Sequence, residues 1–414
     1  MIKWKTVDDY NYRNRVTLLR VDINSPIHPD TKKIVNENRI HKSAPTIQKL
    51  LDKGAKLVII AHQGDTLDYE NLIPMEEHAQ KLNQYINGSI RYIDDPCGPA
   101  AQEEIRKLKA GEGLLLGNLR YLTEETSTFE NVVKLKPELM EQTYLVRSLL
   151  PLCDYYVNDA FSAAHRNAPS MAAFQRLLPT AAGELMCREV EALDQIIESP
   201  DHPCLFVLGG AKISDAFGMM KQVLETGKAD KILTCGVTGE IMLMAKGYSL
   251  GEKKELFIRE RGLDRFVQEA RQYLDKYPQK IDYPIDVVYE RSGERCTLDI
   301  DELPKSELFM DIGEKTIEHY RREIIQAKTI FVNGPAGAYE NPLFERGTKE
   351  VWEAIAAAKG YSVIGGGDTV SAAQRYINLD DIGYVCTAGG AMVRYVSGTK
   401  LPLIEAMDGA QSKG

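Results

Sequence analysis

The sequence lacks the features of a membrane-spanning or secreted protein. No apolar run in its 414 residues approaches the roughly 18 to 20 needed to cross a bilayer, and the first residues carry no apolar segment of a secretory signal. Its seven cysteines form no C-x-x-C pair and no zinc spacing, which is typical of reduced thiols. We therefore expect a cytoplasmic protein without a membrane segment.

Positive charge is also scarce. Lys and Arg number 51 against 60 Asp and Glu, so the formal net charge is −9. Nucleic acids and anionic membrane surfaces favour basic faces, and we expect neither as a partner. The sequence also has no Walker A motif, no G-x-G-x-x-G fingerprint and no solenoid repeat. Any phosphate must therefore be bound by a local cluster of cations or by other loops.

What the sequence does have is a regular alternation of short β-rich runs and segments of helical period. This pattern predicts an α/β protein with parallel sheets. A chain of this length is expected to form two cores rather than one. We predict two Rossmann-like domains, each a parallel sheet covered by helices. The expected strands are residues 16–21, 56–61, 113–116, 155–157, 205–208, 231–235, 285–288, 329–332, 361–364 and 384–386.

A long helical segment separates the two series. Residues 183–198, which follow Pro179, have the pattern of one helix. Shorter amphipathic helices are predicted at 44–51 and 316–325, and Arg39 is expected in a turn before the first of these. The expected parts of the chain are a first domain at 1–178, an interdomain helix with a hinge at 179–198 and a second domain at 199–391.

Polar side chains follow the predicted strands of the first domain. Ligands of open parallel sheets bind beyond the carboxyl ends of the strands. Arginine matches phosphate and carboxylate oxygens bidentately, so this edge predicts a basic pocket for a small polyanion. The competing interpretation is that the arginines are solvated or pair with Asp22 and Asp159. The residues concerned are Asp22, Asn24, Arg39, His62, Gln63, Asn118, Arg120, Asn158, Asp159, His165 and Arg166.

Glycine-rich turns follow the strands of the second domain. Glycine lets backbone N–H groups approach phosphate oxygens, and Thr369 begins a helix suited to anion contact. Lys212 is expected at a nucleotide phosphate. Asp368 is expected to hold a nucleotide-bound Mg²⁺, with a helix N-cap as its alternative role. The turns are residues 209–212, 236, 333–337, 365–369 and 388–391.

The two edges together predict an enzyme that transfers a phosphoryl group between a nucleotide and a small anionic substrate. This chemistry needs in-line positioning, charge neutralisation and exclusion of water more than covalent catalysis. Closure of the two domains would supply these conditions.

Ten ordered stretches resemble the phosphoglycerate kinase family over nearly the whole chain. The His62-Gln63-Gly64 form and the compact length look like the archaeal branch of that family. The stretches are LLRVDINSP (18–26), NRI (38–40), AHQG (61–64), LLLGNLRY (114–121), YVNDAFSAAHR (156–166), VLGGAKISD (207–215), MDIGEKTI (310–317), FVNGPAGAYE (331–340), IGGGDT (364–369) and TAGGA (387–391).

The resemblance implies an enzyme of glycolysis and gluconeogenesis. It would transfer the acyl phosphate of 1,3-bisphosphoglycerate to ADP reversibly, giving 3-phosphoglycerate and ATP with Mg²⁺. We expect a monomer, although an oligomer is not excluded. The resemblance also implies that residues 392–414 return to the first domain.

The family's functional positions are carried over by matching motifs. Asp22, Asn24, Arg39, His62, Arg120 and Arg166 would bind the glycerate and its non-transferred phosphate. The implied nucleotide-binding residues are Gly210, Ala211, Lys212, Asn333, Pro335, Glu340, Gly365, Gly366, Gly367, Asp368 and Thr369, with Glu340 at the ribose. The implied catalytic residues are Arg39 at the reacting carboxyl-phosphate, Lys212, and the N–H groups of Gly366 and Gly389, with Gly367 and Gly390 beside them.

Four positions depart from the family pattern. Asp65 stands where a cation for the substrate phosphate is usual, and Ala216 replaces a second lysine. Three expected glycines appear as Cys235-Gly236-Val237, and Ala388 replaces the first glycine of another run. Asp65 favours one alternative, a related ATP-dependent kinase acting on a different small carboxylic acid. The losses at Ala216 and Ala388 favour another, a catalytically idle nucleotide-binding protein.

Overall fold

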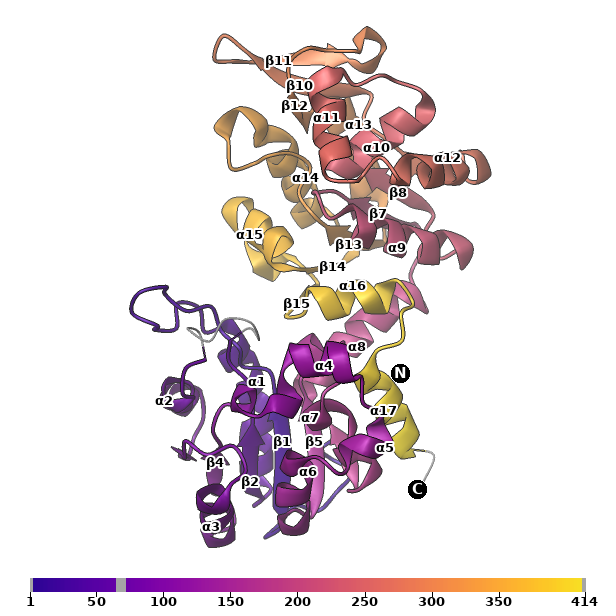
Figure 1. The fold of residues 1–414 in the computed structure, drawn as a ribbon. Helices are drawn as coiled ribbons and strands as arrows, with labels where there is room; N and C mark the ends of the chain where they lie inside the picture. Colours follow the sequence, from indigo (N-terminus) through magenta and orange to yellow (C-terminus); the bar gives the residue numbers. More distant parts are fainter. Residues whose placement is uncertain (1–2, 65–71, 412–414) are drawn as a thin grey trace. The chain divides into compact units, whose positions relative to one another are not determined.

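The computed structural model describes residues 3–64 and 72–411, and the chain divides into two compact units (Figure 1). The first unit comprises residues 1–191 and 400–414, and the second comprises residues 192–399. The division falls inside helix α8 (Glu184–Ile197), which occupies the segment expected to form the interdomain helix.

The first unit contains a six-stranded parallel sheet. Its strand order is β3-β4-β2-β1-β5-β6. Four of these strands lie at the predicted positions, whereas β3 and β6, of three residues each, were not predicted. The strands are β1 (Val16–Val21), β2 (Lys56–Ile60), β3 (Ile90–Tyr92), β4 (Gly113–Leu115), β5 (Tyr155–Asp159) and β6 (Thr180–Ala182).

Both faces of this sheet are buried. Neighbouring strand residues point to opposite faces, and Leu18 and Leu19 accordingly belong to two separate apolar clusters. Helix α1 (Asn38–Asp52) supplies Ile47 and Leu50 to the cluster of Leu19. Helices α3 (Pro99–Lys107) and α6 (Tyr144–Leu149) supply Ile105 and Leu145 to the cluster of Leu18. The strands are therefore mostly apolar, and polar groups such as Thr17 and Arg20 inside β1 are buried.

The second unit repeats this architecture. Its six parallel strands have the order β15-β14-β13-β7-β8-β9. Helices α13 (Glu314–Gln326) and α14 (Arg346–Ala357) pack Tyr320 and Trp352 against one face of the sheet, so that both side chains are fully buried. The predicted fold class, two parallel sheets covered by helices, is confirmed. The strands are β7 (Cys204–Leu208), β8 (Lys231–Thr234), β9 (Ile281–Asp282), β13 (Thr329–Asn333), β14 (Tyr361–Gly365) and β15 (Tyr384–Cys386).

One predicted strand belongs to a different sheet. The run at 285–288 was expected in the parallel sheet, but β10 (Asp286–Arg291) lies at the centre of a separate antiparallel sheet with β11 (Glu294–Asp299) and β12 (Phe309–Ile312). Ser292 and Gly293 both have positive φ, 55° and 81°. A two-residue turn of this kind joins adjacent antiparallel strands, which explains the difference.

The first helix, α1, begins earlier in the sequence than predicted. Arg39 lies in the first turn of α1 and not in a turn before it, because the helix begins at Asn38 and continues through Pro45. The α-helices are α1 (Asn38–Asp52), α2 (Glu76–Tyr85), α3 (Pro99–Lys107), α4 (Ser127–Val133), α5 (Pro137–Met140), α6 (Tyr144–Leu149), α7 (Pro169–Ala172), α8 (Glu184–Ile197), α9 (Ile213–Glu225), α10 (Gly236–Lys246), α11 (Glu252–Glu260), α12 (Phe266–Lys276), α13 (Glu314–Gln326), α14 (Arg346–Ala357), α15 (Gly367–Tyr376), α16 (Gly390–Val396) and α17 (Pro402–Gln411).

The chain returns to the first unit at Lys400, later than the expected residue 392. Helix α16 stays with the second unit because it packs closely on α9, where a Cβ on Gly218 would lie 3.0 Å from Oγ of Ser397. Helix α17 belongs to the first unit. There Nε1 of Trp4 donates to Oδ1 of Asp408 at 2.8 Å, and the N–H of Leu403 donates to the carbonyl of Ala164.

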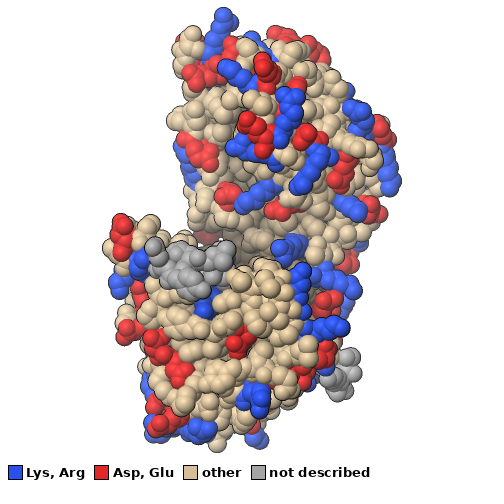
Figure 2. Space-filling view, in the orientation of Figure 1, with Lys and Arg blue, Asp and Glu red and all other residues tan. Residues whose placement is uncertain are grey.

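Three further properties of the chain accompany this fold. Figure 2 shows Lys and Arg interspersed with Asp and Glu on the visible face of the second unit. Among the described residues, we find no helix that combines the length and the apolar character of a membrane span. The seven cysteines are all free thiols.

Candidate active site

Asp22 and Arg39 form the first contact of the predicted glycerate site. Nη1 of Arg39 donates to Oδ2 of Asp22 at 3.1 Å and to the carbonyl of Asn24 at 3.3 Å. Oγ of Ser162 also donates to Oδ2 of Asp22. Burial opposes a charge on Asp22, but the Arg39 guanidinium holds the pKa of that carboxyl well below its usual range. Asp22 is therefore ionised and fixes Arg39 at the end of β1.

His62 is buried beside this pair as a neutral imidazole. Burial lowers the pKa of His62 well below its ordinary value. Its Nδ1 atom lies 3.0 Å from Nη2 of Arg20. Because arginine can only donate, Nδ1 must accept this hydrogen bond, and the ring proton resides on Nε2. His62 can thus donate a hydrogen bond to an anionic or hydroxyl ligand without carrying a charge.

Arg20 was not predicted as a site residue, although it holds His62 in place. The side chain is only 3% exposed, and its Nε donates to Oγ of Ser170 at 3.1 Å. Both the N–H and the Oγ of Ser170 donate to the carboxylate of Glu125 at 2.7 Å. Burial raises the pKa of Glu125, and Arg20 opposes that shift. An arginine in the middle of a strand gives no sequence signal of such a partnership.

Glu125 also joins Arg120 to this network, because Nη1 of Arg120 donates to the Glu125 carbonyl at 2.8 Å. Arg166 is held separately, with its Nε donating to Oε2 of Glu130 at 2.6 Å. The positive charges of Arg20, Arg120 and Arg166 all act on His62 and help to lower its pKa. Two of the predicted arginines, Arg120 and Arg166, therefore lie within electrostatic reach of His62 together with Arg20, and the third, Arg39, pairs with the neighbouring Asp22.

Two of the remaining predicted residues, Asn24 and Asn118, bind the loop after β2. Oδ1 of Asn24 accepts from the N–H of Gly64 at 3.1 Å, and Oδ1 of Asn118 accepts from the N–H of Gln63 at 3.1 Å. Asp65, on which the alternative substrate depends, lies outside the described residues. The competing interpretation of the arginines holds in part: Arg39 pairs with Asp22, whereas Asp159 accepts from the N–H of Met186 at the start of α8.

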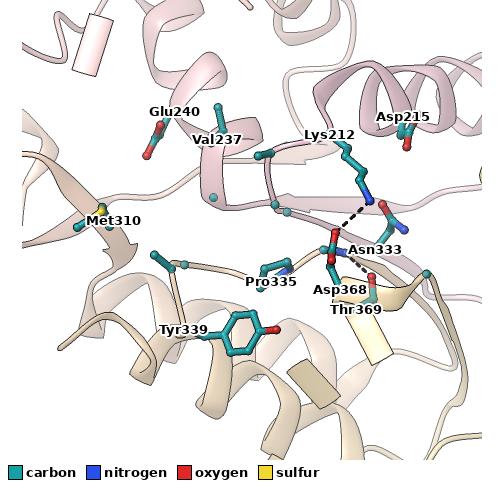
Figure 3. A pocket seen from close by; sticks show the side chains of 18 of the residues that line it. Lys212, Asp215, Val237, Glu240, Met310, Asn333, Pro335, Tyr339, Asp368 and Thr369 are labelled. Atoms are coloured by element: carbon teal, nitrogen blue, oxygen red, sulfur yellow. Dashed lines mark hydrogen bonds and ion pairs between the residues drawn. The ribbon is translucent and has the colours of Figure 1, made fainter. Parts of the chain in front are cut away.

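The second unit contains a pocket of about 670 Å³ that brings the predicted nucleotide residues together. Figure 3 shows Lys212, Asp368 and Thr369 at one end, Glu240 and Met310 at the other. The lining includes Gly210, Ala211, Lys212, Asn333, Pro335, Glu340, Gly366, Gly367, Asp368, Thr369, Gly389 and Gly390, all of them predicted. Gly365 is not among the lining residues, because it ends β14 and a Cβ there would lie 2.4 Å from Sδ of Met392.

The glycines of this pocket are of two kinds. Gly334 has a φ of 89°, and a Cβ there would lie 2.4 Å from the carbonyl oxygen of Gly209, so the fold itself requires glycine. At Gly367 and Gly390 no described atom lies within 4 Å of a built Cβ, and neither φ is in the left-handed region. The missing side chains at these two helix starts leave room for a ligand to approach backbone N–H groups.

Lys212 and Asp368 face each other at one end of the pocket, where Nζ of Lys212 lies 3.0 Å from Oδ2 of Asp368 and both side chains are largely exposed (Figure 3). Asp368 is not the N-cap of α15, since that position is Gly366. Among the described residues no three His, Cys, Asp or Glu side chains gather as a metal site. A single open carboxylate fits Mg²⁺ that arrives on nucleotide phosphates and keeps most of its water ligands.

The opposite end contains two residues that the sequence gave no reason to select. Nζ of Lys254 lies 2.8 Å from Oε1 of Glu240, and both side chains are more than nine-tenths buried. Val237, the residue that departs from the expected glycines, also lines the pocket at this end (Figure 3). Ala216 and Ala388 are buried and are not among the residues that line the pocket.

Comparison with known proteins agrees with this architecture. The family model described as phosphoglycerate kinase matches residues 7–399. The phosphoglycerate kinase of Methanothermus fervidus is 39% identical over 413 residues, covering 100% of this chain and 99% of the relative. That of Thermococcus kodakarensis is 40% identical over 411 residues, covering 97% and 96%. Both sources are archaeal, as the His-Gln-Gly form predicted.

Two solved structures share the fold. The crystal structure of phosphoglycerate kinase from Pyrococcus horikoshii OT3 is 38% identical, has a TM-score of 0.86 and covers 99% of this chain and 100% of its own. The structure of phosphoglycerate kinase from Coxiella burnetii is 29% identical, has a TM-score of 0.83 and covers 98% and 99%. This chain therefore belongs to the phosphoglycerate kinase family, whose members are glycolytic kinases with a carboxylate as phosphoryl acceptor.

Proposed function

We propose that this chain catalyses the reversible, Mg²⁺-dependent phosphoryl transfer between 1,3-bisphosphoglycerate and ADP, giving 3-phosphoglycerate and ATP. The first unit would bind the glycerate, and the second would bind the nucleotide. The observation that carries the proposal is the grouping of Arg20, Arg120 and Arg166 around His62, to which Arg39 is joined through its ion pair with Asp22. A glycine-lined pocket alone would suit many nucleotide-binding proteins, whereas this grouping suits a small substrate with several negative charges.

In the first unit, Arg120 and Arg166 would bind the phosphate that is not transferred. Asp22, Asn24 and His62 would position the glycerate, and the Nε2–H group of His62 would donate a hydrogen bond to it. Arg39 would face the carboxyl oxygen that gains or loses the phosphoryl group. Because Asp22 already holds Arg39 by an ion pair, the guanidinium needs little reorganisation when charge develops.

In the second unit, Lys212 and the backbone N–H groups of Gly366, Gly367, Gly389 and Gly390 would stabilise the phosphoryl group in transfer. Asn333, Pro335 and Thr369 would line the nucleotide, and Glu340 would contact the ribose. Mg²⁺, held by Asp368 and the nucleotide phosphates, would neutralise phosphate charge. No general base is required, since the carboxylate of 3-phosphoglycerate is itself the nucleophile and ADP is the leaving group.

The cellular location, the partners and the oligomeric state of the enzyme complete the proposal. We propose that the enzyme is cytoplasmic and binds neither nucleic acid nor membranes, which its free cysteines and negative net charge support. We also propose that it is a monomer.

The test is turnover with purified protein, Mg-ATP and 3-phosphoglycerate, coupled through glyceraldehyde-3-phosphate dehydrogenase to NADH oxidation. We expect turnover. A panel of other small carboxylic acids, followed by ADP release, covers the alternative that Asp65 favours: a better substrate in that panel would replace 3-phosphoglycerate in the proposal. MgADP binding without turnover on any acid would identify an idle nucleotide-binding protein.

A further inference from the structure

The nucleotide pocket of the second unit has chemically different ends. Lys212 and Asp368 lie at the phosphate end, and apolar side chains of Val237 and Met310 lie at the opposite end (Figure 3). Phe257 and Leu308 add further apolar lining to the pocket. A planar nucleobase buries its faces against apolar side chains of this kind. Adenine or another base would therefore occupy the end at which Glu240 is located.

Glu240 is an unusual component of an apolar base site. Its side chain is 9% exposed and lines the pocket from α10, one turn after Val237. Oε1 accepts from Nζ of Lys254 at 2.8 Å. Oε2 is buried and has no hydrogen-bond partner among the described residues. A buried acceptor without a donor is costly, which indicates that a donor arrives with the ligand.

A purely structural role for the ion pair accounts for only one carboxylate oxygen. Lys254 on α11 lies 4.8 Å from the ring of Phe309 and would hold α10 and α11 together through Oε1 alone. Glutamine at position 240 would satisfy that role without the second charged oxygen. The unpaired Oε2 therefore needs a separate explanation.

We propose that Glu240 selects the nucleobase by accepting, at Oε2, a hydrogen bond from the 6-amino group of adenine. This inference rests on the proposed function, which assigns the pocket to ADP and ATP. Hypoxanthine and guanine present a carbonyl oxygen at position 6, which would place an acceptor against the carboxylate. Both bases carry their nearest donor at N1–H instead of at position 6, so either would have to shift in the pocket to reach Oε2.

The first experiment uses the wild-type protein and three Mg-nucleotides that differ at position 6 and, for IDP, also by a proton on N1. These are ADP, IDP and the diphosphate of purine riboside, which carry an amino group, a carbonyl and hydrogen. Calorimetric titration at pH 8 favours the carboxylate, because burial raises the pKa of Glu240 while Lys254 opposes the shift. We expect ADP to bind about tenfold or more tightly than the purine riboside diphosphate, and IDP to bind most weakly.

The second experiment compares Glu240→Gln with Asp215→Asn. Both change a pocket-lining carboxylate to an amide, but Asp215 lies beyond Lys212 at the phosphate end (Figure 3). A glutamine amide can turn either its oxygen or its NH₂ group toward the base. We therefore expect Glu240→Gln to bring the ADP and IDP affinities within about threefold of each other, and Asp215→Asn to change both by one common factor.

The outcomes separate this inference from the function on which it rests. If wild-type protein binds all three nucleotides equally, Glu240 does not select the base, although the nucleotide site stands. The same conclusion follows if Glu240→Gln keeps the wild-type order. If no nucleotide binds, the proposed function itself fails. The wild-type series needs no variant, so misfolding of Glu240→Gln does not remove the test.

Discussion

Nε of Arg166 donates a hydrogen bond to Oε2 of Glu130 at 2.6 Å, and both side chains are mostly buried. Glu130 also accepts from the N–H of Asn167 at 2.6 Å. The carboxylate thus fixes one edge of a guanidinium that we propose binds the substrate phosphate. In this arrangement Glu130 is a positioning residue, because it acts on the substrate only through Arg166.

Glu130→Ala tests this role. We expect KM for 3-phosphoglycerate to rise about tenfold while kcat changes little, because Arg166 loses the contact that orients it. Initial-rate kinetics measure both constants, and Glu130→Gln should restore part of the loss. Glu141→Ala is the matched control, since Glu141 accepts from Nε of Arg176 at 2.8 Å on the exposed surface of the same unit. A lower KM in Glu130→Ala would show instead that Glu130 competes with the substrate.

Arg39→Ala should reduce kcat by about a hundredfold to a thousandfold, the loss typical of one donor to developing charge. The variant leaves Asp22 buried without its main cationic partner, but the nucleotide pocket lies in the other unit. Calorimetric titration should therefore give an MgADP affinity close to that of the wild type. Near-normal turnover would remove Arg39 from the mechanism. Arg176→Ala serves as the surface control.

Asp368→Asn should weaken MgADP binding and leave 3-phosphoglycerate binding unchanged. The amide keeps the size of the side chain but loses the charge that would hold Mg²⁺ and that now pairs with Lys212. The measurement is a titration of Mg²⁺ at fixed ADP, in which the midpoint should move to about tenfold higher Mg²⁺. An unchanged midpoint would assign Asp368 to the Lys212 contact alone. Asp380→Asn, at an exposed position of the same unit, is the matched control.

His78 makes the stability of the first unit depend on pH. The side chain is fully buried, its Nε2 lies 2.9 Å from Oε1 of Gln63, and burial lowers its pKa to about 4. Above pH 6.5 both folded and unfolded states hold the neutral ring. As the pH falls from 6.5 toward 4, only the unfolded state gains a proton, so the free energy of unfolding decreases, by about 2 kcal/mol at pH 5.

The measurement for His78 is denaturant unfolding at pH 7 and pH 5, followed by a probe in the first unit. His78→Gln should lose less stability than the wild type over this interval, by about 2 kcal/mol. His28→Gln changes an exposed histidine and should behave as the wild type. Equal losses in the wild type and His78→Gln would show that His78 titrates normally.

Much of the fold was predictable because its local signals agree. The apolar runs that form β1 and β13 end in polar or glycine-rich residues, and this pattern alone indicated parallel strands with a ligand edge. The three-residue strands β3 and β6 were missed because such short segments carry no measurable period. The antiparallel β10 was misplaced although Ser292-Gly293 offered a hairpin signal.

The site was predictable where residue type decides its chemistry. Arginines, His62 and the glycine turns could be selected from their positions after strands. Arg20, Glu125 and Glu130 could not, because their roles depend on partners far away in the sequence. The same reason applies to Glu240 and Lys254, whose pairing across two helices has no local signal.

The most direct test of the account compares kcat/KM for 3-phosphoglycerate and for glycerate, both with Mg-ATP and with ADP release as the common readout. The two acids differ only in the phosphate that Arg120 and Arg166 are proposed to bind. We predict a preference for 3-phosphoglycerate of at least about a hundredfold, since two arginine contacts to that phosphate would be lost with glycerate. Equal use of both acids, or a preference for glycerate, would contradict the assignment of these arginines and of the substrate.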